Sequence, residues 1–126
     1  MPLFEICIDN VAGVRAAVEA GAARVELCAS LIEGGITPSI GMVRQAVAAA
    51  AGRLKVHVII RARGGDFLYS EDEFVAMLHD IVAATKPEWC VIKGEFTPRG
   101  GLNTSVFARW PERRTPPSRK KVANSR

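Results

Sequence analysis

The feature that most constrains the fold is a regular alternation of short apolar segments with helical ones, joined by short connections. Strand-like residues lie at 4–8, 24–28, 55–61 and 89–92, and helical patterns separate them. A strand that returns through one helix to the same end of a sheet must run parallel to its predecessor, with a right-handed crossover. We therefore expect an α/β fold of about four parallel strands and three helices.

The expected helices begin at residues that are typical of helix starts. Thr37 before Pro38 predicts the start of the second helix, because proline at the first helical position loses no needed hydrogen bond. Within that helix, Ile40, Val43 and Val47 recur with helical spacing and are predicted to face the core. For the third helix, Ser70 and Glu73 have the spacing of a capping box.

Composition excludes several classes of protein. The chain has 126 residues, 48% of them hydrophobic, which suits one domain with a modest core. Apolar runs of about 18 residues are absent, so we expect no membrane-spanning helix. The first residues show no secretory signal, and three cysteines are too few for a disulfide scaffold. These features favour a cytoplasmic location.

Charge divides the chain into two parts. Residues 1–98 carry nine Lys/Arg against twelve Asp/Glu, whereas residues 99–126 carry eight against one. We therefore expect a folded, mildly acidic region at 1–98 and a disordered, basic, Pro/Arg-rich tail at 99–126. The tail has two interpretations, a solvated terminus or a targeting or phosphate-binding segment. A basic tail on an acidic domain does not indicate a specific nucleic-acid interface.

Side-chain alternation sorts each expected strand into an apolar face and a polar face. Helices must cover the apolar face, so the polar residues point to the other side. Burying such charges is costly unless they pair, and arginine suits pairing with carboxylates. The residues of this polar set are Glu5, Cys7, Glu26, Cys28, His57, Arg61 and Arg63.

Ligand sites in parallel α/β domains lie at the carboxyl ends of the strands, where Cys7 and Cys28 are expected. Each cysteine could be a small core residue, but together they offer two soft sulfur donors, which suit Cu(I). Glu5 and Glu26 lie one layer deeper and are candidates for acid–base catalysis. His57 is interpreted as a hydrogen-bonded core residue.

A second candidate site is an anion site at the end of the third strand. Arg61 and Arg63 precede Gly64-Gly65-Asp66, which could form either a tight turn or a nest of backbone amides. Charged guanidinium groups beside such a nest would hold phosphate or carboxylate. The sequence therefore allows an enzyme acting on a small anionic metabolite as an alternative to a copper-binding protein.

Four motifs follow one another along the chain: Glu5-Ile6-Cys7, Arg24-Val25-Glu26-Leu27-Cys28, Glu33-Gly34-Gly35-Ile36-Thr37-Pro38-Ser39-Ile40-Gly41 and Ile60-Arg61-Ala62-Arg63-Gly64-Gly65-Asp66-Phe67-Leu68-Tyr69-Ser70. In this order and at this spacing they resemble the CutC copper-homeostasis family over roughly residues 3–85. The resemblance implies a TIM-like (β/α) barrel, a cytoplasmic location and Cu(I) binding through Cys7 and Cys28. It also places Glu5, Glu26, His57, Arg61, Arg63 and Asp66 along the family's cavity. Ala62 replaces the proline that is usual in the family.

Length limits what this resemblance predicts. A complete eight-stranded barrel takes about 250 residues, whereas this chain offers four strand candidates. We therefore expect an incomplete barrel at 1–98, with the family pattern truncated or frame-shifted after about residue 98. Unpaired edge strands and an uncovered polar face predict a homo-oligomer. Three functions follow as alternatives: a copper-homeostasis protein, an enzyme, or a non-functional fragment.

Overall fold

A computed structural model describes residues 3–96 and 104–111 of the chain. In this part of the chain, none of the helices has the length and apolar character required to cross a membrane. The elements, in chain order, are β1 (Glu5–Ile8), α1 (Val11–Glu19), β2 (Arg24–Leu27), the short 3₁₀ helix η1 (Leu31–Glu33), α2 (Ile40–Ala50), β3 (Lys55–Val58), α3 (Glu71–Thr85), β4 (Cys90–Phe96) and β5 (Thr104–Trp110).

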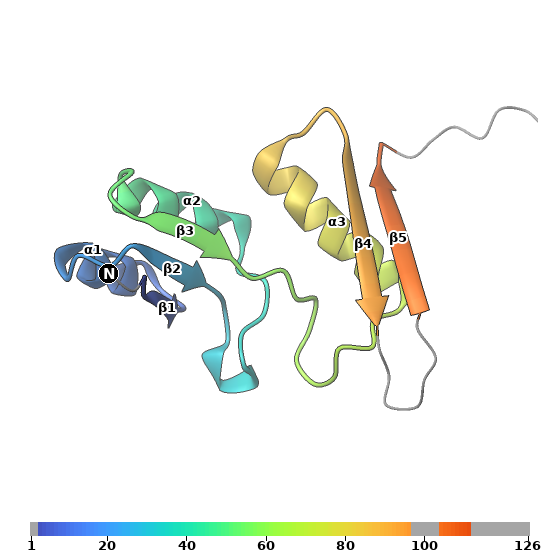
Figure 1. Cartoon of the computed structure of the whole chain (residues 1–126), viewed down its shortest axis with the longest axis horizontal. Coiled ribbons are helices and arrows are strands. Elements are labelled where there is room, and N and C mark those ends of the chain that lie inside the picture. Colours follow the sequence, from blue (N-terminus) through green and yellow to red (C-terminus); the bar gives the residue numbers. More distant parts are fainter. Residues whose placement is uncertain (1–2, 97–103, 112–126) are drawn as a thin grey trace, which may run out of the picture.

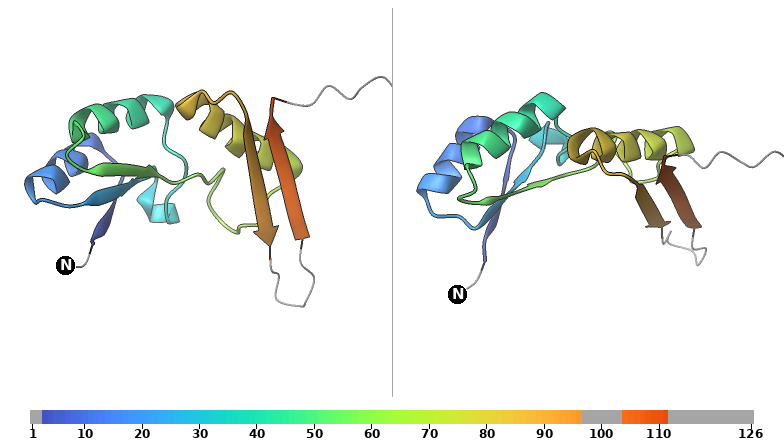
Figure 2. Two further views of the ribbon diagram at one scale, coloured as in Figure 1. Left: turned by 45° about the horizontal axis from the view of Figure 1, so that its top comes forward. Right: turned by 90° about the horizontal axis from the view of Figure 1, so that it is seen from above.

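The first three strands form the parallel sheet that the alternating pattern predicts, in the order β1-β2-β3 (Figure 1). Cys7 lies opposite Glu26 on β2, and Glu26 lies opposite His57 on β3. Helices α1 and α2 lie together on one face of this sheet (Figure 2). The polar side chains lie on the opposite face of the sheet, which these helices do not cover.

The main core lies between this sheet and helices α1 and α2. Val25 and Leu27 of β2, the central strand, are completely buried, as is Val14 of α1. Helix α2 contributes Ala46 and Ala50 to the same cluster. Their small side chains let α2 pack closely against the sheet, so short strands suffice to build a dense core.

The predicted inner face of α2 is correct for Val43, which packs against the main core, and wrong for Ile40 and Val47. Ile40 is 39% exposed and Val47 is 54% exposed, whereas Ala46 and Ala50 are buried. The larger residues point along the surface toward α3, where they line a groove with Ala83. Helical spacing identified an apolar stripe. However, the close approach of α2 to α1 and to the sheet leaves room mainly for small side chains, so the alanines are the residues buried there.

The helix starts agree with the sequence except at α2. Ser70 and Glu73 form the predicted capping box at the start of α3. At α2 the cap is Ser39, whose hydroxyl accepts a hydrogen bond from the Met42 amide at 3.2 Å. Thr37, the predicted cap, instead exchanges hydrogen bonds with the Arg61 backbone. The proline rule thus placed the start of α2 two residues too early.

The fourth strand is not part of the parallel sheet. Instead, β4 pairs antiparallel with β5, and this hairpin packs against α3 beside the three-stranded sheet (Figure 1). Phe74 and Leu78 of α3 and Ala108 of β5 are buried in this second core. The expectation of four parallel strands is therefore corrected to three parallel strands and a separate hairpin.

Strand β5 occupies residues that were expected to lack regular structure. Val106 and Ala108 face α3, whereas Phe107 is 65% exposed, so the segment alternates as a strand does. An antiparallel partner close in sequence needs no helical crossover, and this favours the hairpin over pairing with β3. Of the tail predicted to be disordered, residues 99–103 and 112–126 lie outside the described residues, and for these the disorder stays a prediction.

A pair of leucine substitutions tests the position of the main core. We expect Leu27→Ala to lower the free energy of unfolding by roughly 2–5 kcal/mol, because it leaves a cavity in a fully buried position. The matched variant Leu68→Ala, at a side chain that is 74% exposed, should change it by less than about 0.5 kcal/mol. Urea unfolding followed by circular dichroism measures both; equal effects would contradict the described core.

Candidate functional site

The uncovered face of the parallel sheet carries polar side chains in two rows. In the first row, Glu5 of β1 lies opposite Arg24 of β2. In the second, Cys7 lies opposite Glu26, and His57 follows on β3. Apolar neighbours such as Val25 point to the opposite, helix-covered side and are buried. The predicted division into two faces is therefore confirmed for the residues of β1, β2 and β3, whereas Arg61 and Arg63 lie beyond the end of β3.

Cys7 and Glu26 contact each other directly on this face. The Cys7 thiol donates a hydrogen bond to Glu26 Oε2 at a distance of 2.8 Å. This bond raises the pKa of the Cys7 thiol from 9.0 to about 11, with smaller contributions from burial and from the charge of Glu26. Glu26 thus holds Cys7 in its protonated form, because a thiolate would face a carboxylate.

Cys28 lies one step further along the sheet and is enclosed by a loop. It is 1% exposed, and its thiol donates to the Ile8 carbonyl oxygen at 3.3 Å. Burial is the main cause of its raised pKa. Gly35 covers it: a Cβ on Gly35 would lie 3.1 Å from the Cys28 Cβ, and its φ is +88°. Only glycine fits this approach without strain.

The register places the two cysteines diagonally rather than side by side. Cys7 pairs with Glu26, and Cys28 follows two residues later on the same side of the chain. Diagonal positions on neighbouring strands are about 7–8 Å apart, which still allows long or turned side chains to meet. Within residues 3–96 and 104–111, no three His, Cys, Asp or Glu side chains cluster as a metal site would require.

Glu5 is engaged by two partners that the sequence did not assign to it. Its Oε2 lies 3.0 Å from Arg24 Nε and 2.8 Å from His57 Nδ1. We expected the glutamates to pair with Arg61 and Arg63, which the structure places elsewhere. The interpretation of His57 as a core residue is also wrong, because its side chain lies on the uncovered face and is 48% exposed. Arg24 was overlooked, although it lies two residues before Glu26 and therefore shares its face.

The buried side chain of Arg61 links two loops through hydrogen bonds. It is 7% exposed, and its guanidinium donates to the carbonyl oxygens of Glu33 at 2.8 Å, Gly35 at 2.9 Å and Gly65 at 2.9 Å. The Phe67 ring covers it, with 4.8 Å between the guanidinium carbon and the ring centroid. Arg61 therefore holds the loop over Cys28 in place.

Arg63 connects the same loop to the start of α3. Its guanidinium donates to Glu73 Oε1 at 2.5 Å and to Asp66 Oδ1 at 3.1 Å. It also donates to the carbonyl oxygens of Gly64 and Leu68. Its hydrogen bond helps to lower the pKa of the Asp66 carboxyl below its usual range.

These contacts bear on the predicted anion site at Arg61, Arg63, Gly64, Gly65 and Asp66. The structure brings the five residues together in the loop after β3, but both guanidinium groups already bind loop carbonyls or carboxylates. An anion would have to replace those partners. Anion binding at this loop stays a prediction.

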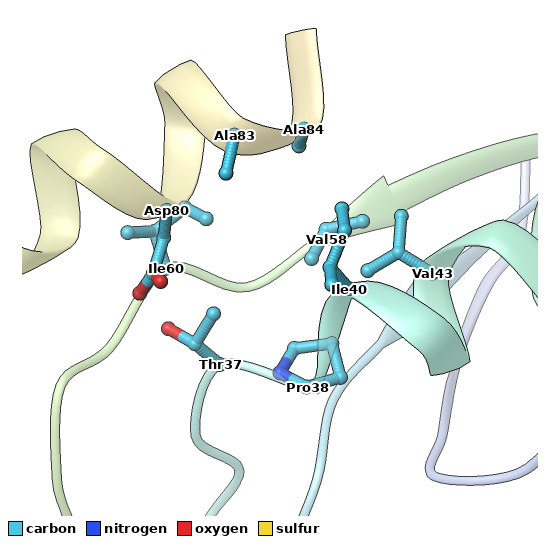
Figure 3. Close-up of a pocket in the computed structure, with 9 residues that line it drawn as sticks. All are labelled: Thr37, Pro38, Ile40, Val43, Val58, Ile60, Asp80, Ala83 and Ala84. Atoms are coloured by element: carbon cyan, nitrogen blue, oxygen red, sulfur yellow. The ribbon is translucent and has the colours of Figure 1, made fainter.

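A small hollow lies on the helical side of the fold, between α2, the end of β3 and α3 (Figure 3). Its side-chain oxygens come from Thr37 and Asp80 (Figure 3). The hollow encloses about 40 Å³, little more than one water molecule. A space of this size has no room for a metabolite. The remaining lining is apolar: Pro38, Ile40, Val43, Val58, Ile60, Ala83 and Ala84.

Comparison with known proteins identifies the class to which this fold and polar face belong. A crystal structure from Streptococcus agalactiae, described as a copper homeostasis protein CutC, superposes with a TM-score of 0.63 and 38% sequence identity. The match covers 68% of this chain and 41% of that one. The parallel strands and their helices thus have the arrangement of the corresponding part of an α/β CutC structure.

Sequence comparison gives the same family. A CutC family protein of Mesorhizobium japonicum is 58% identical over 83 residues, which are 66% of this chain and 31% of that protein. A CutC family protein of Porphyromonas gingivalis is 45% identical over 107 residues, 84% of this chain and 42% of that protein. The chain thus spans about a third to two fifths of the length of these relatives.

A model of the CutC family matches residues 2–111 of the chain. The chain belongs to the CutC family. The match includes both β4 and β5, so the family-like region extends past residue 98, where the sequence motifs placed its end.

The contact between Cys7 and Glu26 predicts how the thiol reacts. Glu26→Gln removes the negative charge beside Cys7, so the pKa of the thiol should fall and more thiolate should be present at pH 8. We expect alkylation of Cys7 by iodoacetamide to accelerate by about ten-fold or more. Peptide mass spectrometry measures the rate at Cys7 separately from the other cysteines.

The matched control is Glu19→Gln, which removes an exposed carboxylate at the end of α1. It should leave the alkylation rate of Cys7 unchanged. Equal alkylation rates of Cys7 in wild type and Glu26→Gln would show that Glu26 does not keep the Cys7 thiol protonated.

Proposed function

We propose that this chain is a cytoplasmic copper-homeostasis protein that binds Cu(I) through Cys7 and Cys28. The observation that carries the proposal is the placement of two thiols on neighbouring parallel strands, at the carboxyl end of the sheet and on its polar face. Membership of the CutC family supports the same role. Soft sulfur ligands favour Cu(I) over harder ions.

Binding at these thiols has two requirements. Both thiols must lose their protons, and both have a raised pKa, so Cu(I) affinity should increase with pH. Cys28 is buried beneath Gly35, so the loop from Ser30 to Thr37 must move aside for the metal to reach it. Cys7 is exposed and would make the first contact.

Cysteine variants test this function. Under anaerobic, reducing conditions, Cu(I) competition with bicinchoninate should show stoichiometric binding that is lost in Cys7→Ser and in Cys28→Ser. Cys90→Ser is the matched control, because Cys90 packs in the α3–β4–β5 core away from the polar face. Retention of wild-type affinity by both single variants would show that these thiols are not the ligands.

We further propose that the chain forms a homo-oligomer. Within the described residues, β1 and β3 each pair on one side only, and unpaired strand edges favour association. Exposed apolar side chains add to this tendency, among them Phe4 at 66% and Ile6 at 43% on or beside β1.

Light scattering coupled to size exclusion tests this association. We expect a mass that is a multiple of the single chain. Ile6→Lys should shift the mass toward one chain, because a charge at the edge strand opposes pairing. The control Val75→Lys lies on α3, also partly exposed at 37%, and should leave the mass unchanged. A monomeric wild type would contradict the proposal.

A further inference from the structure

The polar face carries a histidine that is held by a carboxylate and that copper binding does not use. His57 Nδ1 lies 2.8 Å from Glu5 Oε2, and Arg24 Nε approaches the same oxygen at 3.0 Å. A carboxylate oxygen 2.8 Å from an unprotonated Nδ1 would set two electron pairs against each other, so this contact favours the tautomer of neutral His57 that carries its proton on Nδ1. The other ring nitrogen, Nε2, then keeps its lone pair.

The surroundings of His57 leave the ring accessible. Its side chain is 48% exposed, more than the 36% of both Glu5 and Arg24. On the same face, Glu26 lies opposite it on β2, and Lys55 precedes it by two residues on β3. The negative charges of Glu5 and Glu26 balance the positive charges of Arg24 and Lys55. This face therefore has no net charge that would attract an ion. A small polar molecule without net charge is the class of ligand that such a surface accommodates.

We propose that His57 is a proton-transfer residue for such a molecule, and that Glu5 is the positioning residue that fixes its tautomer. In the step, an O–H or N–H bond of the ligand breaks and its electron pair stays on the ligand. The proton forms a bond to His57 Nε2, and the ring becomes an imidazolium whose Nδ1 lies 2.8 Å from the Glu5 carboxylate. A carboxylate that orients an imidazole and stabilises its cation is a general arrangement in acid–base catalysis.

This proposal is independent of copper, because neither Cys7 nor Cys28 takes part. It also differs from the expectation that Glu5 or Glu26 acts as the acid or base. Both glutamates are engaged, Glu5 by His57 and Arg24 and Glu26 by the Cys7 thiol. The nitrogen with a free electron pair belongs to His57.

The tautomer of His57 provides the first test. The chain has two histidines, so long-range ¹H–¹⁵N correlation spectra of the ¹⁵N-labelled full chain, without copper, can be assigned with His79→Gln. At pH 8.5 we expect the proton of His57 on Nδ1. In Glu5→Gln it should move predominantly to Nε2, whereas Arg24→Met should leave it on Nδ1. A proton on Nε2 in wild type would overturn the proposal.

Reactivity provides the second test. Diethyl pyrocarbonate is attacked by the unprotonated ring nitrogen: a bond forms from Nε2 to the carbonyl carbon, and the ethyl carbonate group leaves. We expect His57 to react at least about three-fold more slowly in Glu5→Gln than in wild type, with His79 unchanged in both. Glu5→Asp keeps the negative charge, but its shorter side chain places the carboxylate further from His57. It should slow the reaction of His57 as Glu5→Gln does, and it replaces Glu5→Gln in the test if that variant does not fold. An unchanged rate at His57 in the folded variant would overturn the proposal.

Discussion

The buried guanidinium of Arg61 is the interaction on which the geometry of the strand ends depends. It binds carbonyl oxygens of two separate loops, at Glu33 and Gly35 on one side and at Gly65 on the other. Hydrogen bonds from a charged donor are each stronger than neutral ones, and carbonyls left without a partner in a buried place are costly. Arg61 therefore connects the loop that covers Cys28 to the loop that leads into α3.

The polar face shows why this anchor matters for function. Cys7 is open to solvent, whereas Cys28 is enclosed by a glycine loop that Arg61 holds. On the same face, His57 Nδ1 lies beside the Glu5 carboxylate. The two thiols and the imidazole thus share one surface, and each exposed group has a carboxylate partner: Glu26 accepts a hydrogen bond from the Cys7 thiol, and Glu5 contacts the His57 ring.

Much of this arrangement could be predicted from the sequence, because it depends on local patterns. Side-chain alternation placed Glu5, Cys7 and Glu26 on one face, and the capping box at Ser70 marked the start of α3. Other features depend on which residues meet in space. The partners of Glu5 are Arg24 and His57 rather than Arg61 and Arg63, because the register brings the first pair beside it and the loops hold the second.

The α/β alternation, the family and the polar composition of one sheet face follow from the sequence alone, because strand and helix periodicities and short motifs are properties of neighbouring residues. The burial of Ala46 and Ala50 in α2, the pairing of β4 with β5 and the burial of Arg61 depend instead on the tertiary structure. Each of these outcomes depends on contacts between residues that are distant in sequence. Close packing, strand pairing and hydrogen bonding of buried carbonyl groups decide which of those contacts form, and local sequence patterns do not specify them.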